Sequence, residues 1–194
     1  MATYLDMQTR IADEMLNEPI TTAQIKLAIQ GAINDWSNEQ FYFDQKNGTF
    51  NTVANQEYYT STDFADIPNM QRVFVANITI NGSKIPIKGV DFADIDAQQP
   101  GTVTGPPLAW ANYNQQLRMY PIPDAVYAMS FSYLYNLPTL SADADTNAWM
   151  NDGEELIRQG AKRRLWYDVL YNAQNGQLCQ QLENDAAEIG RAHV

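Results

Sequence analysis

Hydrophobic residues near the start of the chain recur at the three- and four-residue spacing of an α-helix. Thr3 followed by Asp6 matches a capping box, and Pro19 ends this first pattern. Thr21 or Thr22 starts a second pattern, in which Gln24 can complete another capping box. The two hydrophobic stripes are Tyr4, Met7, Ile11 and Met15, and then Ile25, Ala28, Ile29, Ala32, Ile33 and Trp36. We therefore expect two N-terminal helices, the second running to about residue 40.

From Asn47 the pattern changes to short alternating runs separated by Gly, Asn, Asp and Pro, which is typical of antiparallel strands. Three hairpins are predicted, with turns at 54–56, Asn81-Gly82 and Asn114-Gln115. Residues 89–107 predict a short helical turn and a loop. A last strand, "VYAMSFSYLYN", alternates strictly at Tyr127, Met129, Phe131 and Tyr133. Roughly six to eight strands in this region favour a small sandwich or barrel.

The helical spacing returns after the strands. One stripe consists of Ile157, Ala161, Leu165 and Val169, and a weaker last one of Leu178, Leu182, Ala186 and Ile189. Asn175-Gly176 predicts a stop or kink between them. The order of elements predicts an α+β fold, with an antiparallel β-domain inserted into a helical bundle. We expect a bundle over 1–46, the β-rich insertion over 47–137, a junction and long helix over 138–175, and a C-terminal helix or arm over 176–194.

Composition narrows the class of protein. The 194 residues include 23 acidic and 12 basic ones, which gives a net charge of −11 and disfavours a conventional nucleic-acid binder. An acidic wall could still let DNA pass without sticking to it. No apolar run approaches a membrane span, and the N-terminus does not resemble a secretory signal, so we expect no membrane partner. The single cysteine, Cys179, suits a reducing compartment.

The stretch "DADTNAWMNDGEE", residues 143–155, has nearly the spacing of a calcium loop. The ligand positions 1, 3, 5, 9 and 12 hold Asp143, Asp145, Asn147, Asn151 and Glu154. Ala148 stands where the loop needs a turn glycine, and Pro138 argues against a preceding helix. We interpret the acids as caps and solvated loop residues. Asn151 or Asp152 would start the next helix, and Trp149 would fix the junction against the core.

Catalytic patterns are sparse. The one histidine, His193, is the penultimate residue, which argues against a triad or a metal cluster. Cys179 lies beside Leu178 and Leu182 in the last stripe and is interpreted as a packed thiol. The segment "NGSK" lies in a hairpin turn and lacks the context of a phosphate loop. We expect no cofactor, no bound metal and no enzymatic activity.

For three groups of residues, the sequence allows both a functional and a purely structural interpretation. Paired carboxylates could hydrolyse glycosides, although all of them lie at loops or helix starts: Asp91, Asp94, Asp96, Glu154 and Glu155. A basic run could face an acidic surface across a subunit interface, or simply form a solvated face: Arg158, Lys162, Arg163 and Arg164. Aromatic clusters at 41–43 and 58–59 could bind sugar, but packing in a core or an interface is favoured.

The assembled pattern resembles the head-to-tail adaptor proteins of tailed phages, which are similar in plan to the tubular tail proteins of short-tailed phages. The resemblance covers nearly the whole chain and lies in five stretches: "TYLDMQTRIADEM", "TTAQIKLAIQGAINDWSNEQFYF", "TFNTVANQEYYT", "GPPLAWANYNQQLRMYPIPDA" and "NAWMNDGEELIRQGAKRRL". None of them carries a catalytic signature.

The resemblance implies a structural protein of the virion neck, assembled in the host cytoplasm. It implies a ring of copies, usually twelve, that docks on the portal protein, contacts the next tail or nozzle protein, and extends a channel for double-stranded DNA without binding it specifically. It also assigns the C-terminal segment, 176–194, to portal contact. The candidate contact residues there are Leu178, Leu182, Ile189, Arg191 and Val194. The alternatives are a carbohydrate-binding virion module and a cell-wall hydrolase.

Overall fold

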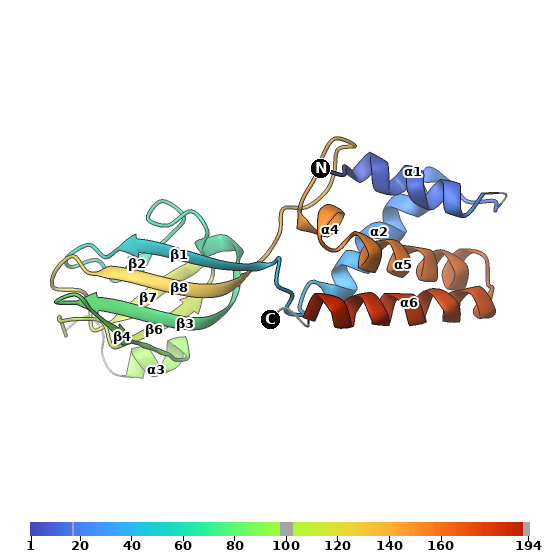
Figure 1. Cartoon of the computed structure of the whole chain (residues 1–194). Helices are drawn as coiled ribbons and strands as arrows, with labels where there is room; N and C mark the ends of the chain where they lie inside the picture. The colour runs from blue at the N-terminus through green and yellow to red at the C-terminus, as the bar shows by residue number, and fades with distance from the viewer. Residues whose placement is uncertain (17, 98–102, 192–194) are drawn as a thin grey trace. The chain divides into compact units, whose positions relative to one another are not determined.

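The computed structural model describes residues 1–16, 18–97 and 103–191. The chain divides into two compact units (Figure 1). The helical unit consists of residues 1–44 and 137–194, and the β-unit consists of residues 45–136. The boundaries predicted from the sequence were 46/47 and 137/138. The β-unit is therefore a single continuous stretch of chain between the two parts of the helical unit.

Two capping boxes start the N-terminal helices, as predicted. Helix α1 spans Tyr4–Glu14 and is capped by Thr3 and Asp6, and helix α2 spans Thr22–Trp36 and is capped by Thr21 and Gln24. In each box the side chains satisfy backbone N–H groups that have no partner within the helix. Helix α2 ends a turn earlier than the expected residue 40.

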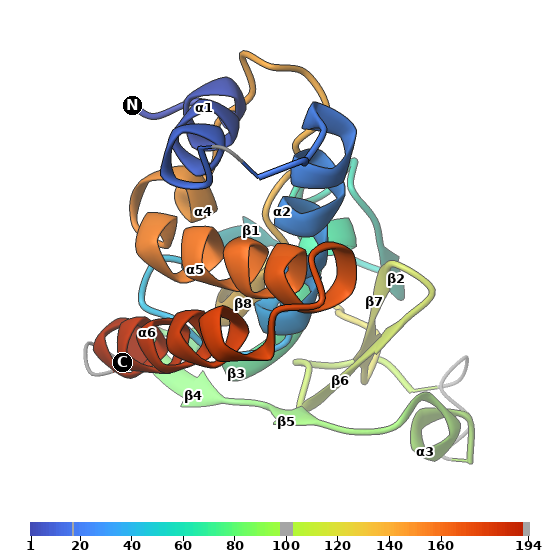
Figure 2. The same ribbon diagram turned by 90° about the vertical axis from the view of Figure 1, so that its right-hand side faces the viewer.

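The C-terminal part of the helical unit contains a short helix α4 (Ala148–Asn151), helix α5 (Glu154–Arg164) and helix α6 (Ala173–Arg191). Helix α5 passes into one π-helical turn over Leu165–Val169, and the break follows at Tyr171, whose φ of 52° is left-handed. The predicted stop at Asn175-Gly176 is therefore wrong, because both residues lie in the first turn of α6. Helix α5 lies between α2 and α6 (Figure 2).

A single apolar core holds these helices together. Its largest members include Tyr4, Ile11, Ile29, Phe41 and Trp149, all of them at most 4% exposed. Phe41 and Phe43 stack with their ring centroids 5.3 Å apart, and each ring meets Trp149 edge-on. Trp149 thus fixes the junction to the helical core, as predicted from its place between the last strand and α5.

The β-unit contains two four-stranded sheets within the described residues. The first has the order β1-β8-β3-β4 and the second the order β2-β7-β6-β5. Their strands are β1 Gln45–Asn51, β2 Tyr58–Tyr59, β3 Met70–Ile80, β4 Ser83–Pro86, β5 Lys88–Gly89, β6 Ala109–Tyr113, β7 Gln116–Tyr120 and β8 Ala128–Tyr135. All pairs are antiparallel except β5 with β6. A short helix, α3, spans Phe92–Ala97, where a helical turn was expected.

Two of the three predicted hairpins are confirmed. Strands β3 and β4 pair across Asn81-Gly82, and β6 and β7 pair across Asn114-Gln115, with positive φ at all four turn residues. The predicted hairpin around residues 54–56 is wrong. Strand β1 pairs instead with β8, about eighty residues further along, and β2 pairs with β7 (Figure 1).

The alternation in the last strand is confirmed at Met129, Phe131 and Tyr133, which are all buried, whereas Tyr127 precedes β8 and is only partly buried. The three buried residues belong to a β-unit core that also contains Tyr59, Ile78, Leu117 and Met119. The predicted α+β class is therefore confirmed. The finer architecture, a bundle carrying a sandwich-like or barrel-like insertion, stays a prediction.

Candidate functional site

Helix α6 presents one face to the helical core and another to solvent. Its buried residues are Gly176, Cys179, Glu183 and Ala187. Leu178, Leu182 and Ile189 lie on the opposite side and are 57%, 41% and 66% exposed. Cys179 therefore does not share a face with Leu178 and Leu182, and that part of the prediction is wrong. It is nevertheless a packed thiol, whose pKa is raised by burial.

A buried ion pair explains why the leucine stripe faces outward. The Glu183 carboxylate, only 2% exposed, accepts hydrogen bonds from Arg163 Nε at 2.5 Å and Trp36 Nε1 at 2.7 Å. Gly160 on α5 makes room for it, because a Cβ there would lie 2.8 Å from Glu183 Oε1 and 3.0 Å from Ala32. These polar contacts fix α6 on α2 and α5, and they leave the face with Leu178, Leu182 and Ile189 exposed.

The four basic residues of α5 form ion pairs with other parts of the helical unit. Arg158 pairs with Glu14, Glu154 and Glu155, and Lys162 donates to Glu14 at 2.8 Å. Arg163 and Arg164 both pair with Asp35 on α2, at 2.9 and 2.6 Å, and Arg163 also pairs with Glu183.

These ion pairs have a structural use, since they connect α5 to α1, α2 and α6. Arg158 is buried and the other three cations are only partly exposed, so the charges act at low local dielectric. A solvated face, the simpler of the two interpretations, does not describe this arrangement. The role of these four residues in a subunit interface stays a prediction.

The remaining predicted contact residues lie at the end of α6. Arg191 pairs with Glu39 at 3.1 Å, and its guanidinium lies over the Trp36 ring at 5.4 Å. Arg191 therefore helps to hold the end of α6 to α2 and the residues after it. Val194, and likewise His193, lie outside the described residues.

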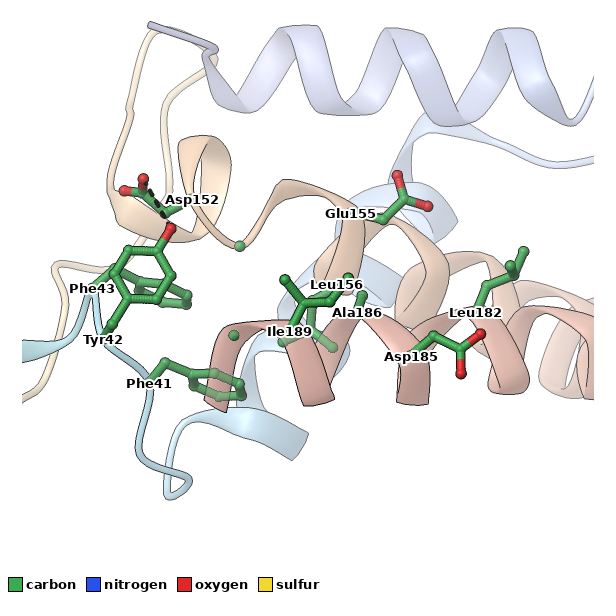
Figure 3. Close-up of a pocket in the computed structure, with 12 residues that line it drawn as sticks. Phe41, Tyr42, Phe43, Asp152, Glu155, Leu156, Leu182, Asp185, Ala186 and Ile189 are labelled. Atoms are coloured by element: carbon green, nitrogen blue, oxygen red, sulfur yellow. Dashed lines mark hydrogen bonds between the residues drawn. The ribbon is translucent and has the colours of Figure 1, made fainter. Parts of the chain in front are cut away.

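A groove runs along the exposed side of α6 (Figure 3). Its volume is about 320 Å³. Leu182, Ala186 and Ile189 of α6 form one wall, and Leu156 of α5 lies beside them. The aromatic segment 41–43 lies near the C-terminal end of α6 and lines that end of the groove. The groove is thus apolar and built from three separate stretches of the helical unit.

Three carboxylates line the same groove. Asp152 accepts a hydrogen bond from the Tyr42 hydroxyl at 3.4 Å, and Glu155 pairs with Arg158. Asp185 has no hydrogen bond or ion pair among the described residues. The groove therefore offers apolar walls with acidic groups beside them, which suits an apolar side chain flanked by cations.

The acidic stretch 143–155 is occupied by contacts within the chain. Asp143 pairs with Lys26 at 2.7 Å, and this hydrogen bond lowers the pKa of Asp143. Asp145 accepts from the backbone N–H groups of Ser141 and Ala142, both at 2.7 Å, which lowers its pKa as well. Among the described residues, no group of three or more His, Cys, Asp or Glu side chains is arranged to hold a metal ion.

The helix start in this stretch differs from the prediction. Asn147 caps the short helix α4, accepting from the N–H of Trp149 at 3.0 Å. Asn151 and Asp152 lie at the end of α4, and α5 follows with Gly153 at its cap position. The predicted cap at Asn151 or Asp152 is therefore wrong, because a one-turn helix precedes the long one. Glu154 pairs with Arg10 and Arg158, both at 3.1 Å.

The paired acids of 91–96 lie in the β-unit around α3. Asp96 pairs with Arg118 Nη1 at 2.6 Å, and Arg118 Nε contacts Glu57 at the same distance. Arg118 is buried, and its guanidinium also lies over the Phe92 and Tyr58 rings. Asp96 thus helps to hold α3 to β7, and the same arginine contacts β2 through Tyr58.

Sequence reasoning missed the groove and Asp185, the acid of the groove that has no partner among the residues described. The "FYF" run at 41–43 gave one usable signal, because three consecutive aromatics after a helix mark a packing site. The other wall could not be found, since its orientation depends on the buried Glu183–Arg163 pair.

Comparison with known proteins identifies one family. The family model described as SU10 adaptor protein matches residues 2–193. No curated protein sequence matches the chain. Among the described residues, the helices are all too short or too polar to cross a membrane.

Proposed function

The chain belongs to the SU10 adaptor protein family, a family of phage head-to-tail adaptors, and from this premise we propose that twelve copies form a ring between portal and tail. As an adaptor it is a structural component of the virion. In the proposed ring the copies extend the channel through which double-stranded DNA passes. The observation that carries the proposal is the family match, because it extends over residues 2–193 and so includes both units.

Portal contact is proposed for the C-terminal segment 176–194. Its exposed Leu178, Leu182 and Ile189 support this, since a helix in a stable monomer seldom leaves its most apolar face in water. An apolar helical face of this kind fits a groove or a facing helix on a partner. We propose that a tail or nozzle protein binds the assembled ring on its far side.

Charge supports the proposed channel. The helical unit holds 16 of the 23 acidic residues but only seven of the 12 basic ones. Wherever such a surface lines a channel, it repels phosphates and keeps the passing DNA from adhering.

Electron microscopy of the purified protein mixed with its portal protein tests the proposal. The expected image is a twelve-subunit ring coaxial with the portal, with α6 at the contact. The proposal would be contradicted if portal particles showed no added density even at about 100 μM adaptor, a concentration about 100 times a micromolar Kd. Free monomer before mixing is compatible with assembly on the partner.

A further inference from the structure

The cations without an ion pair are gathered in one part of the chain. Nine of the twelve Lys and Arg residues form ion pairs within the chain, including all seven of the helical unit. The other three, Arg72, Lys84 and Lys88, have no ion pair among the described residues, and all lie in the β-unit. The positive charge available to a partner is therefore concentrated in the stretch 72–88.

Two of these cations share a segment that forms an edge of both sheets. Strand β4 is one edge strand of the first sheet, and β5 is one edge strand of the second. Residues 83–89, which we name the edge segment, contain both strands. Lys84 and Lys88 are exposed, and Ile85 between them is 40% exposed. The edge segment thus contains an exposed apolar residue between two lysines, neither of which pairs with an acid in the described ranges.

The groove on α6 has the complementary chemistry. Its walls are apolar, Asp185 has no hydrogen bond or ion pair in the described part of the chain, and Asp152 and Glu155 add negative charge. The helical unit around it has more than twice as many acids as bases. A cation of a partner placed beside Asp185 would therefore form an ion pair that no described residue of the same chain forms.

We propose that the groove beside α6 binds the edge segment of a neighbouring copy, with Ile85 against Leu182 and Ile189 and a lysine at Asp185. Within the C-terminal segment, Leu182 and Ile189 then face the neighbouring copy, and Leu178, which does not line the groove, is left for the portal. This contact rests on the proposed ring. Closed rings use heterologous interfaces, in which two different surfaces of one chain meet. Contact between two helical units would bring two strongly acidic surfaces together, whereas the less acidic β-unit supplies the missing cations.

Photocrosslinking tests the contact in the assembled ring. A benzoylphenylalanine replaces Ile189, and the variant is mixed with isotope-labelled wild-type chain and the portal protein. The expected crosslink joins position 189 to labelled residues 83–89. Crosslinks to the portal, or to another surface of the labelled chain, would overturn the proposal while leaving the ring intact. Absence of the ring itself would contradict the proposed function and this contact together.

A charge exchange tests the same contact by an independent measurement. Asp185→Lys and Lys84→Glu should each weaken ring assembly by about tenfold, and the chain carrying both substitutions should recover most of this loss. Asp13→Lys is the matched control, because Asp13 is an exposed acid of α1 outside the groove. Both test positions are exposed, so thermal unfolding should be unchanged. The proposed contact would be overturned if the double variant assembled no better than the single variants. It would also be overturned if only the Asp13→Lys control lost ring assembly.

Discussion

At the scale of single residues, Asp44 is the most unusual acid in the chain. It is 3% exposed, and its carboxylate accepts the backbone N–H of Phe41 at 3.1 Å. Burial raises the pKa of Asp44 to about 6. Hydrogen bonds from the backbone of Phe41 and of Asp44 itself lower this pKa, but they only partly offset the burial. The folded state therefore holds the proton more tightly than the unfolded chain. Protonated Asp44 therefore stabilises the folded state. This contribution to the free energy of unfolding is fully present below the pKa of the unfolded chain and is lost as the pH rises through about 6.

Asp44→Asn removes this pH dependence. The variant should be more stable than wild type at pH 8 by on the order of 2 kcal/mol, since one pKa unit corresponds to about 1.4 kcal/mol. At pH 4 the two proteins should have nearly equal free energies of unfolding. Urea unfolding at both pH values measures the difference, with Asp13→Asn as an exposed control. A constant difference across this range would contradict the assignment.

The Arg163–Glu183 pair gives a second prediction at this scale. Arg163→Gln leaves a buried carboxylate without its cation and should destabilise the helical unit by roughly 2–4 kcal/mol. Glu183→Gln added to it should restore a large part of the loss, because no unpaired charge then remains. Arg10→Gln, at a mostly exposed cation, should cost less than about 1 kcal/mol. A double variant no more stable than Arg163→Gln would refute this.

At the scale of elements, local signals were readable and long-range pairing was not. The capping boxes at Thr3 and Thr21 could be predicted because all their groups lie within four residues. The partner of β1 could not, since β1 and β8 are distant in sequence and residues 54–56 offered a nearer turn. The orientation of α6 could not be predicted for a related reason: it depends on the Glu183 carboxylate, which is held by Arg163 of α5 and by the indole N–H of Trp36 of α2.

The β6–β7 turn predicts a stabilising substitution. Gln115 has a φ of 60°, which costs a residue with a Cβ about 1 kcal/mol more than glycine. Gln115→Gly should therefore raise the free energy of unfolding by roughly 0.5–1 kcal/mol. The reverse change at the matching turn, Gly82→Gln, should lower it by a similar amount, because Gly82 has a φ of 78° and open space around it. Effects of the opposite sign at both turns would contradict the explanation.

Helix α6 should separate stability from assembly. Leu182→Ser together with Ile189→Ser removes two exposed apolar side chains, so the free energy of unfolding should change by less than about 1 kcal/mol. Binding to the portal and ring formation should fall by at least about tenfold. Leu27→Ser is the matched control, because Leu27 is 72% exposed on α2 and lies outside the groove of α6. Unchanged assembly in the double variant would remove α6 from the interface.

At the scale of the whole molecule, the order of helices and strands carried more information than any single motif. The helix–strand–helix order predicted the α+β class, and diffuse likeness over nearly the full length indicated the adaptor family before any contact was known. The candidate site was predicted only as a segment, with Leu178, Leu182 and Ile189 named as anchors. The opposing wall comes from residues 41–43 and 152–156, which no local pattern connects to α6.

The most direct measurement uses the phage that encodes this chain, with its gene inactivated. Without the protein, filled heads should accumulate beside free tails, because no ring joins the portal to the tail. Purified wild-type chain added to these extracts should restore tailed, infectious particles, and the Leu182→Ser/Ile189→Ser variant should not. Infectious tailed particles formed in the absence of the chain would contradict its role as the head-to-tail adaptor.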